Sequence, residues 1–264
     1  MTAGGFAVLG GLVAAAIFAP HLAPYIPTVQ NLSRGLEGPS LEHWMGLDRL
    51  GRDILSRIIY GSRISLAVGL SVVSVSLGFG VVVGSAAGLG GRWLDEGLMR
   101  VIDILQAFPG ILLAIALTAV LGPSLGNVVL ALCLFGWVGY ARIVRGQILA
   151  VREMEFVDAA RSAGAGSVRL AAKHILPNIL SPVIVEATFG MAGAITAEAG
   201  LSFLGLGVQP PTPSWGTMLA EGRQVMLVAD HLTIFPGLAI ALVVLALNFL
   251  GDALRDRLDV RADA

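Results

Sequence analysis

Charged residues are scarce in this chain. They make up 13% of its 264 residues, whereas soluble domains contain about 25%. Hydrophobic residues account for 56%, and the mean hydropathy is +0.82. This composition excludes an ordinary soluble domain and indicates an integral membrane protein with one membrane domain. The net charge of −1 gives no general attraction to nucleic acid.

Lysine and cysteine each occur once. A Walker A phosphate loop requires Gly-Lys-Ser/Thr, and Lys173 does not stand in that sequence, so a nucleotide site of this type is excluded. Cys133 has no second cysteine for an intrachain disulfide. No pattern resembles a catalytic triad, so we expect a protein that is not an enzyme. The histidines are scattered and indicate no metal site: His21, His43, His174 and His231.

Six apolar segments are candidates for membrane spans. They are residues 6–22, 62–89, 98–121, 128–149, 179–199 and 233–250. The first is barely long enough to cross a bilayer, and Pro109 is expected to kink the third. An even number of spans places both ends of the chain on one side.

The basic residues indicate the orientation of these spans. If the loop at residues 150–178 is cytoplasmic, most Lys and Arg residues lie inside, as the positive-inside rule requires. Most of the others fall in the first external loop. Because Arg34 is the first basic residue and signal peptides begin with a positive region, a cleaved signal peptide is the less favoured interpretation of the first segment.

The stretch from Glu155 to Asn178 is the longest with little apolar run between two long apolar segments. Gly164 and Gly166 are expected to end a first short helix. Ser167 is expected to cap a second helix, which Pro177 stops. A small, apolar face of the first helix recurs at helical spacing: Phe156, Ala159, Ala160 and Ala163.

This pattern permits several interpretations. An ordinary cytoplasmic loop would not need the alternation of alanine and glycine. A DNA-binding helix-turn-helix also uses a glycine turn, but it needs a soluble domain around it. An amphipathic helix lying on lipid is compatible with a docking role for the same stretch. We favour a surface that another protein approaches closely, with Asp158 as a charge for the partner to contact.

At these residues the chain resembles the EAA loop of the membrane subunits of bacterial ABC importers. The family pattern is Glu-Ala-Ala, three residues, Gly, nine residues, then Ile-x-Leu-Pro. This chain departs from the family pattern at two positions. Asp158 replaces the glutamate, and His174 replaces the isoleucine. The resemblance implies that this loop docks on an ATPase subunit and transmits its motion. The matching residues are Asp158, Ala159, Ala160, Gly164, Leu176 and Pro177.

Three further stretches resemble peptide-type importers. The outer connection from Gly200 to Gln224 is similar to that of the second membrane subunit, and its prolines predict a rigid, non-helical crossing. The end of the chain, GDALRDRLD, also matches. The segment Leu47–Leu66 resembles the stretch before the core domain. In that segment we expect a solvated amphipathic helix at the membrane surface, whose polar face carries Arg49, Arg52, Asp53 and Arg57.

Ionisable residues within the spans are costly and often functional. Asp103 and Arg142 lie at similar depth in consecutive antiparallel spans, so we expect an intramembrane ion pair. For Asp103, Glu186 and Glu198 a structural ion pair, or a polar contact with the partner subunit, is favoured over a substrate contact. The residues that bind substrate are not predicted by the sequence.

Taken with the resemblance, the chain is predicted to be all-α, with six transmembrane helices in a type I ABC importer permease fold. Residues 1–61 would hold the first helix, the external loop and the amphipathic segment. Residues 62–264 would form the core domain, with the coupling loop at residues 150–178. The expected location is the bacterial inner membrane.

The resemblance implies the partners and the cargo. They are a homologous permease subunit, two ATPase subunits that hold ATP and Mg, and an external binding protein, with no cofactor in this chain. Short peptides are favoured over nickel as cargo, because metal-ligating side chains are rare in the spans. An ion-gradient-driven secondary transporter and a membrane-bound enzyme are the alternatives. The enzyme would need a polar constellation within the spans.

Overall fold

The protein is all-helical in the computed structural model, which describes residues 2–259. Four long helices form the bundle: α3 (Ile54–Leu89), α6 (Leu125–Val151), α9 (Leu176–Phe203) and α11 (His231–Asp259). The shorter helices are α1 (Thr2–Ile17), α2 (Ala19–Leu22), α4 (Arg92–Gln106), α5 (Gly110–Leu121), α7 (Glu155–Ser162), α8 (Ser167–Leu170) and α10 (Trp215–Arg223). A 3-10 turn η1 (Leu32–Arg34) and a π-helical turn η2 (Ala171–Ile175) complete the chain.

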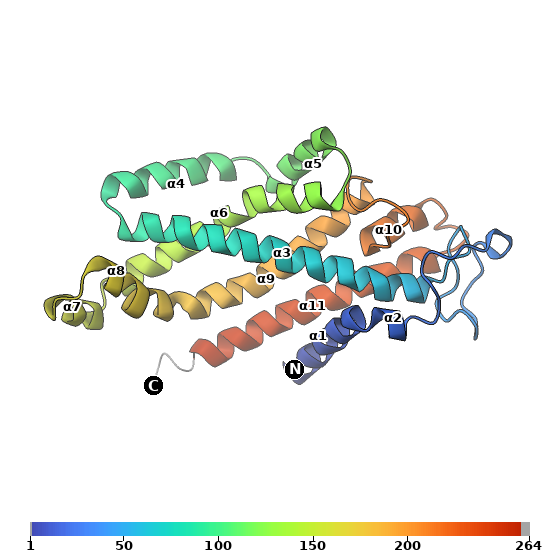
Figure 1. Ribbon diagram of the computed structural model, residues 1–264, viewed down its shortest axis with the longest axis horizontal. Coiled ribbons are helices and arrows are strands. Elements are labelled where there is room, and N and C mark those ends of the chain that lie inside the picture. The colour runs from blue at the N-terminus through green and yellow to red at the C-terminus, as the bar shows by residue number, and fades with distance from the viewer. Residues whose placement is uncertain (1, 260–264) are drawn as a thin grey trace.

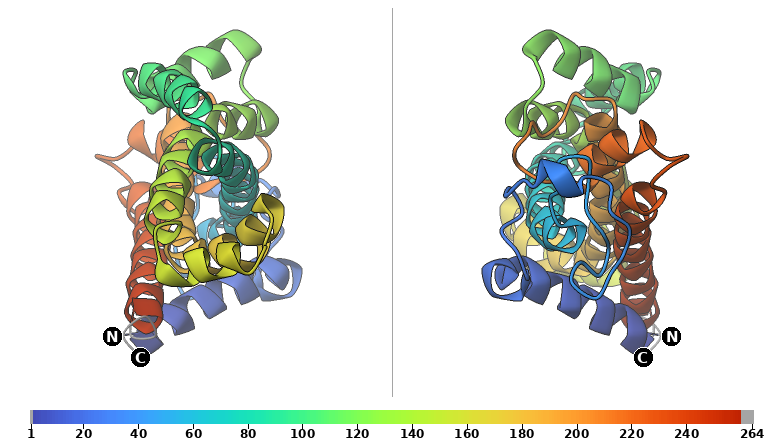
Figure 2. Two further views of the ribbon diagram at one scale, coloured as in Figure 1. Left: turned by 90° about the vertical axis from the view of Figure 1, so that its left-hand side faces the viewer. Right: turned by 90° about the vertical axis from the view of Figure 1, so that its right-hand side faces the viewer.

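The long helices lie side by side, and the loops gather at two opposite ends (Figure 1). The helices α7 and α8 form one end. The loop that follows α2 and the helix α10 form the other. Figure 2 shows α1 and α11 on one side of the bundle and α4 and α5 on the opposite side. The chain is therefore elongated, with its two polar ends separated by apolar helices.

Small residues bring α3 and α6 close together. A Cβ atom added at Gly80 would lie 2.5 Å from the Tyr140 Cβ, and one added at Gly84 would lie 2.5 Å from the Ala141 carbonyl oxygen. Glycine at these positions lets the two helix backbones approach, as expected for helices that pack within a membrane. The small residues of α3 thus have a packing role.

The six expected spans are not all confirmed. Four described helices are long and apolar enough to cross a membrane, and α4 with α5 makes a fifth candidate if that bent pair is one span. The apolar part of α1, Ala7–Ile17, is shorter than the others. At Pro109 the chain breaks by 75° between α4 and α5, because proline lacks the N–H that would continue the helix. The expected kink is thus a full break.

The boundary expected between residues 61 and 62 falls inside α3, which runs unbroken for 36 residues. Residues 47–53 are not helical, and the helix begins at Ile54, where the Asp53 carboxylate accepts a hydrogen bond from the Ser56 N–H. The expectation of a separate, solvated amphipathic helix is therefore wrong. The apolar face of this segment packs inward, and Arg52, Asp53 and Arg57 are also buried, whereas Arg49 is exposed.

Candidate functional site

The loop formed by α7, α8 and η2 is anchored by apolar side chains. Val157 of α7, Leu170 of α8 and Ile175 of η2 are buried against Ile148 of α6 and Ile179 of α9. These anchors come from every part of the loop, so the loop is fixed to the ends of two long helices. A force applied to its surface would therefore pass directly to α6 and α9.

A glycine turn ends α7. Gly164 has a φ of +86°, a conformation that costs residues with a Cβ atom about 1–2 kcal/mol. Its N–H donates to the Arg161 carbonyl, and the Ala165 N–H donates to the Ala160 carbonyl. This pair of hydrogen bonds is the Schellman arrangement. The prediction that glycine ends the first helix is confirmed at Gly164, whereas Gly166 instead precedes α8 with ordinary backbone angles.

Two details of the predicted loop are wrong. Ser167 makes no capping hydrogen bond, and Gly166 occupies the N-cap position. Pro177 does not stop the helix, since residues 167–203 form one span-length helix. The π-helical turn η2 immediately before Leu176 changes the hydrogen-bond register, and Pro177 then stands in the first turn of α9. Proline is tolerated there because first-turn N–H groups have no partner within the helix.

The outer surface of the loop combines a charge with small side chains. Asp158 and Ala159 are exposed, as is Gly164 at the turn. The Asp158 carboxylate accepts a hydrogen bond of 2.7 Å from Arg161. Phe156 is also exposed, at 40%, so the surface of α7 carries an aromatic ring as well. The surface can receive a close-fitting partner with both apolar and polar contacts.

The other predicted loop residues lie nearer the bundle. Ala160 packs partly against the anchoring apolar cluster, and so does Leu176 at the beginning of α9. Pro177 is exposed. The six residues thus divide between the outer surface of α7, the turn at Gly164 and the junction with α9.

Asp103 and Arg142 are in contact. The Arg142 Nη2 donates to the Asp103 Oδ1 across 2.7 Å, which joins α6 to α4. A second pair lies along the same two helices, where Arg145 donates to the Asp95 Oδ2 at 2.7 Å. Arg142 and Asp103 are 47% and 58% exposed, respectively. The pair therefore lies on an open face of this chain.

A buried charged cluster at the opposite end was missed from the sequence. We call Asp48, Arg52, Arg57 and Glu221 the external charge cluster. Arg52 Nη2 lies 2.9 Å from the Glu221 Oε2, and Arg57 Nη1 lies 2.8 Å from the same oxygen. Both guanidinium groups also bind the Asp48 carboxylate. The cluster ties the loop that follows α2 and the beginning of α3 to α10.

The neighbouring surface loop carries an exposed charge group. Arg34 donates to the Glu37 and Glu42 carboxylates, and these hydrogen bonds lower the pKa of both carboxyl groups. The same contacts raise the pKa of Arg34 above its usual value. This group lies at the surface, in contrast to the buried external charge cluster.

The outer connection is non-helical at its prolines, as predicted, through residues 204–214, but the helix α10 begins at Trp215, inside the predicted stretch. Ser214 begins α10 with a capping box, in which its side chain and that of Thr217 bond each other's backbone N–H groups. Trp215 is buried and donates through Nε1 to the Ile58 carbonyl at 3.0 Å. A Cβ atom added at Gly216 would lie 2.4 Å from the Ala199 carbonyl oxygen. These contacts hold α10 against α3 and α9.

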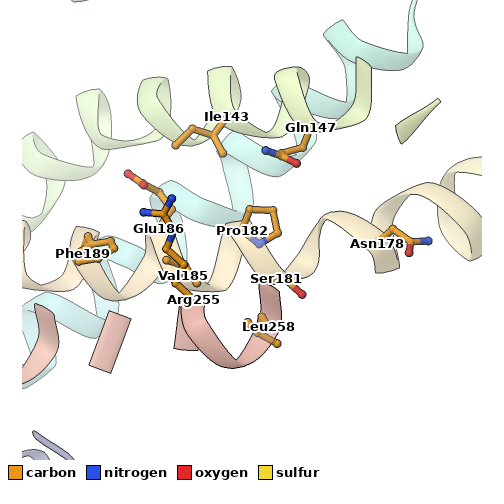
Figure 3. A pocket seen from close by; sticks show the side chains of 10 residues that line it. All are labelled: Ile143, Gln147, Asn178, Ser181, Pro182, Val185, Glu186, Phe189, Arg255 and Leu258. Atoms are coloured by element: carbon orange, nitrogen blue, oxygen red, sulfur yellow. The ribbon is translucent and has the colours of Figure 1, made fainter. Parts of the chain in front are cut away.

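A groove of about 500 Å³ lies between α6, α9 and α11 (Figure 3). Its walls carry Gln147, Ser181, Glu186 and Arg255 among apolar side chains. It opens toward the half of the bundle that carries α7 and α8, since Asn178 also lines it. Within residues 2–259 no group of three or more His, Cys, Asp and Glu side chains could hold a metal ion.

The comparisons with known proteins all find subunits of transport systems. Residues 80–263 match the family described as binding-protein-dependent transport system inner membrane component. The chain is 47% identical over 255 residues to the dipeptide transport system permease protein DppC of Alkalihalophilus pseudofirmus, covering 97% of this chain and 84% of that protein. It is 48% identical over 263 residues to the glutathione transport system permease protein GsiD of Escherichia coli O157:H7, covering 98% and 85%.

One solved structure shares the fold. It is described as an inward-facing conformation of the MetNI methionine ABC transporter, and the match has a TM-score of 0.64 at 18% sequence identity. The match covers 78% of this chain and 97% of that chain. At this identity the likeness concerns the fold alone.

Proposed function

The chain belongs to the family of binding-protein-dependent transport system inner membrane components, and from this membership we propose that it carries short peptides across the bacterial inner membrane. It would do so as one membrane subunit of an ATP-driven importer. The observation that carries the proposal is the identity of nearly half, over almost the whole chain, to permeases named for dipeptide and glutathione transport.

In this proposal the loop of α7, α8 and η2 is the coupling site for an ATPase subunit. The ATPase would contact Asp158, Ala159 and the turn at Gly164. Leu176 and Pro177, at the junction with α9, would carry the motion into that helix. Supporting this role, the anchors Val157, Leu170 and Ile175 are buried, so the loop cannot move without α6 and α9.

The proposed assembly has four further parts. A homologous permease subunit would complete the pathway, two ATPase subunits would bind ATP and Mg, and an external binding protein would deliver the peptide. Residues 62–264 would form the core with its coupling loop at 150–178, and residues 1–61 the preceding segment. The helix α2 follows α1 after the single residue Phe18, and the two together would supply the sixth crossing.

The test is uptake by cells that lack this subunit. Labelled di- and oligopeptides, and nickel in parallel, are supplied to the deletion strain and to the strain complemented with the intact gene. Peptide uptake should be lost in the deletion strain and restored by the gene, with nickel uptake unchanged. Loss of nickel uptake with peptide uptake intact would contradict the peptide proposal.

A further inference from the structure

The ionisable residues within the long apolar part of the chain have different surroundings. Asp103 is paired with Arg142. Glu198 is buried and accepts a hydrogen bond of 2.7 Å from the Ser202 hydroxyl. Glu186 shares the groove of about 500 Å³ with the cationic Arg255 (Figure 3). Ionisable residues within spans are often functional, and Glu186 lines hollows of the protein, which makes it the candidate for contact with a passing ligand.

Glu186 stands between two hollows. It lines the groove of about 500 Å³ described above, and it also lines a recess of about 240 Å³ between α3, α6 and α9. The recess would hold on the order of eight waters at about 30 Å³ each, a space that suits a small polar solute. The two hollows therefore meet along α9, at one acidic side chain.

The recess is lined largely by small residues, which leave room for ligand side chains of different size. Gly139, Gly193, Ala194 and Ala197 are among its lining residues. A Cβ atom added at Gly139 or at Gly193 would meet no atom within 4 Å. Glycine is thus not required there by packing within this chain, in contrast to Gly80 and Gly84. The space that these two glycines leave open is available to a ligand.

Two hydroxyl groups in the same wall are without polar partners. Ser76 and Tyr140 line the recess and are 1% and 6% exposed. Neither side-chain oxygen has a hydrogen bond to another part of the described chain. Buried hydroxyl groups are normally satisfied, so these two would bond a polar molecule in the recess once a side-chain rotation exposed them to it.

We propose that this recess is a transit subsite for the peptide, in which the Glu186 carboxylate binds the ammonium group of the substrate. The inference rests on the proposed function and specifies its substrate contact. A carboxylate can only accept hydrogen bonds, and its attraction for a cation is stronger away from bulk water. The peptide groups that follow the ammonium offer donors and acceptors to the two hydroxyls, and the small walls tolerate varied side chains.

The first test measures the electrostatic potential of the recess without relying on transport. In the assembled importer with Cys133→Ala, single cysteines are placed by Gly139→Cys and Gly193→Cys. Each is labelled with a cationic and an anionic methanethiosulfonate reagent. The ratio of cationic to anionic labelling rates should exceed that at Gly146→Cys, an exposed control on α6 that also meets no atom within 4 Å.

Adding Glu186→Gln should lower this ratio at residues 139 and 193 by on the order of tenfold and leave it unchanged at residue 146. A dipeptide with a free amine should slow the labelling in the presence of Glu186, and its N-acetylated form should not. An unchanged ratio would overturn the proposal. So would a complete lack of labelling, because the homologous subunit would then fill the recess.

The second test compares substrates in proteoliposomes with saturating, peptide-loaded binding protein. For a free-amine peptide, Glu186→Gln should reduce the uptake rate by about tenfold or more, and Glu186→Asp should retain part of it. The same substitution should change uptake of an N-acetylated peptide much less. Glu96→Gln, at an exposed pair on α4, is the matched control. If the unaltered importer takes up no peptide, the proposed function fails. If it does so and both peptides respond equally to Glu186→Gln, the subsite fails.

Discussion

Arg57, at the start of α3, lies 2.8 Å from Glu221 in α10, although the two residues are 164 positions apart in the chain. Arg57 is only 2% exposed and also binds the Asp48 carboxylate. The loop that follows α2, the beginning of α3 and α10 therefore meet at one guanidinium group. A buried charge stays stable only while its partners remain in place.

Arg57→Ala should therefore destabilise the protein strongly. Without the Arg57 guanidinium, the negative charge of the buried Asp48 carboxylate is balanced less well. Such changes lower the free energy of unfolding by about 3–5 kcal/mol. We expect a clear fall in the thermal unfolding midpoint of the purified protein in detergent. Arg34→Ala, in the exposed loop group, is the control and should leave the midpoint almost unchanged. Equal midpoints for the two variants would show that the external charge cluster is not stabilising.

The coupling loop makes a second prediction. Asp158→Lys reverses the charge beside Arg161, and Gly164→Val forces a β-branched residue into a φ of +86°, where it is strongly disfavoured. Both variants should insert normally but lose peptide uptake and co-purify less ATPase.

The matched controls are Glu153→Lys, another exposed carboxylate of the loop that lies before α7, and Gly166→Val, at a φ of −70°. Both should keep most of the uptake. Full activity in Asp158→Lys and Gly164→Val would show that the loop has no coupling role.

The Asp103–Arg142 pair predicts an energetic coupling between α4 and α6. Asp103→Asn and Arg142→Gln should each lower stability, because each leaves one charge unpaired. The double variant should lose less free energy of unfolding than the two single variants lose together. The difference, which is the interaction free energy, should be about 0.5–3 kcal/mol. The same cycle on Arg92 and Glu96, an exposed pair on α4, should be close to additive. Additive losses at Asp103 and Arg142 would contradict the prediction.

The absence of a Gly-Lys-Ser/Thr sequence predicts no ATP hydrolysis by the chain alone. The purified protein should release no phosphate from ATP above the background of a mock preparation. ATP hydrolysis should appear when the ATPase subunit is added. The permease should stimulate this hydrolysis, and Asp158→Lys should weaken the stimulation. Hydrolysis by the clean, isolated chain would overturn the assignment of ATP binding to a partner.

The sequence alone determined the membrane class and the long helices, since apolar length and low charge leave few other places for such segments. It also determined the turn at Gly164, because a left-handed backbone position favours glycine whatever surrounds it. The break at Pro109 has the same local origin, in a missing N–H group. The spacing of the motif that contains Asp158, Leu176 and Pro177 was enough to identify the loop from the sequence.

Only the tertiary structure decided features whose causes lie far apart in the chain. Arg52 and Arg57 fit the pattern of a solvated helix face, and only the approach of Glu221 and Asp48 explains their burial. The helix passes Pro177 because η2 shifts the hydrogen-bond register just before it, which local propensity does not reveal. The surroundings of Glu186 depend on three helices that pack around it. Helix formation follows from neighbouring residues, whereas the partners of a buried charge depend on which helices the packing brings together.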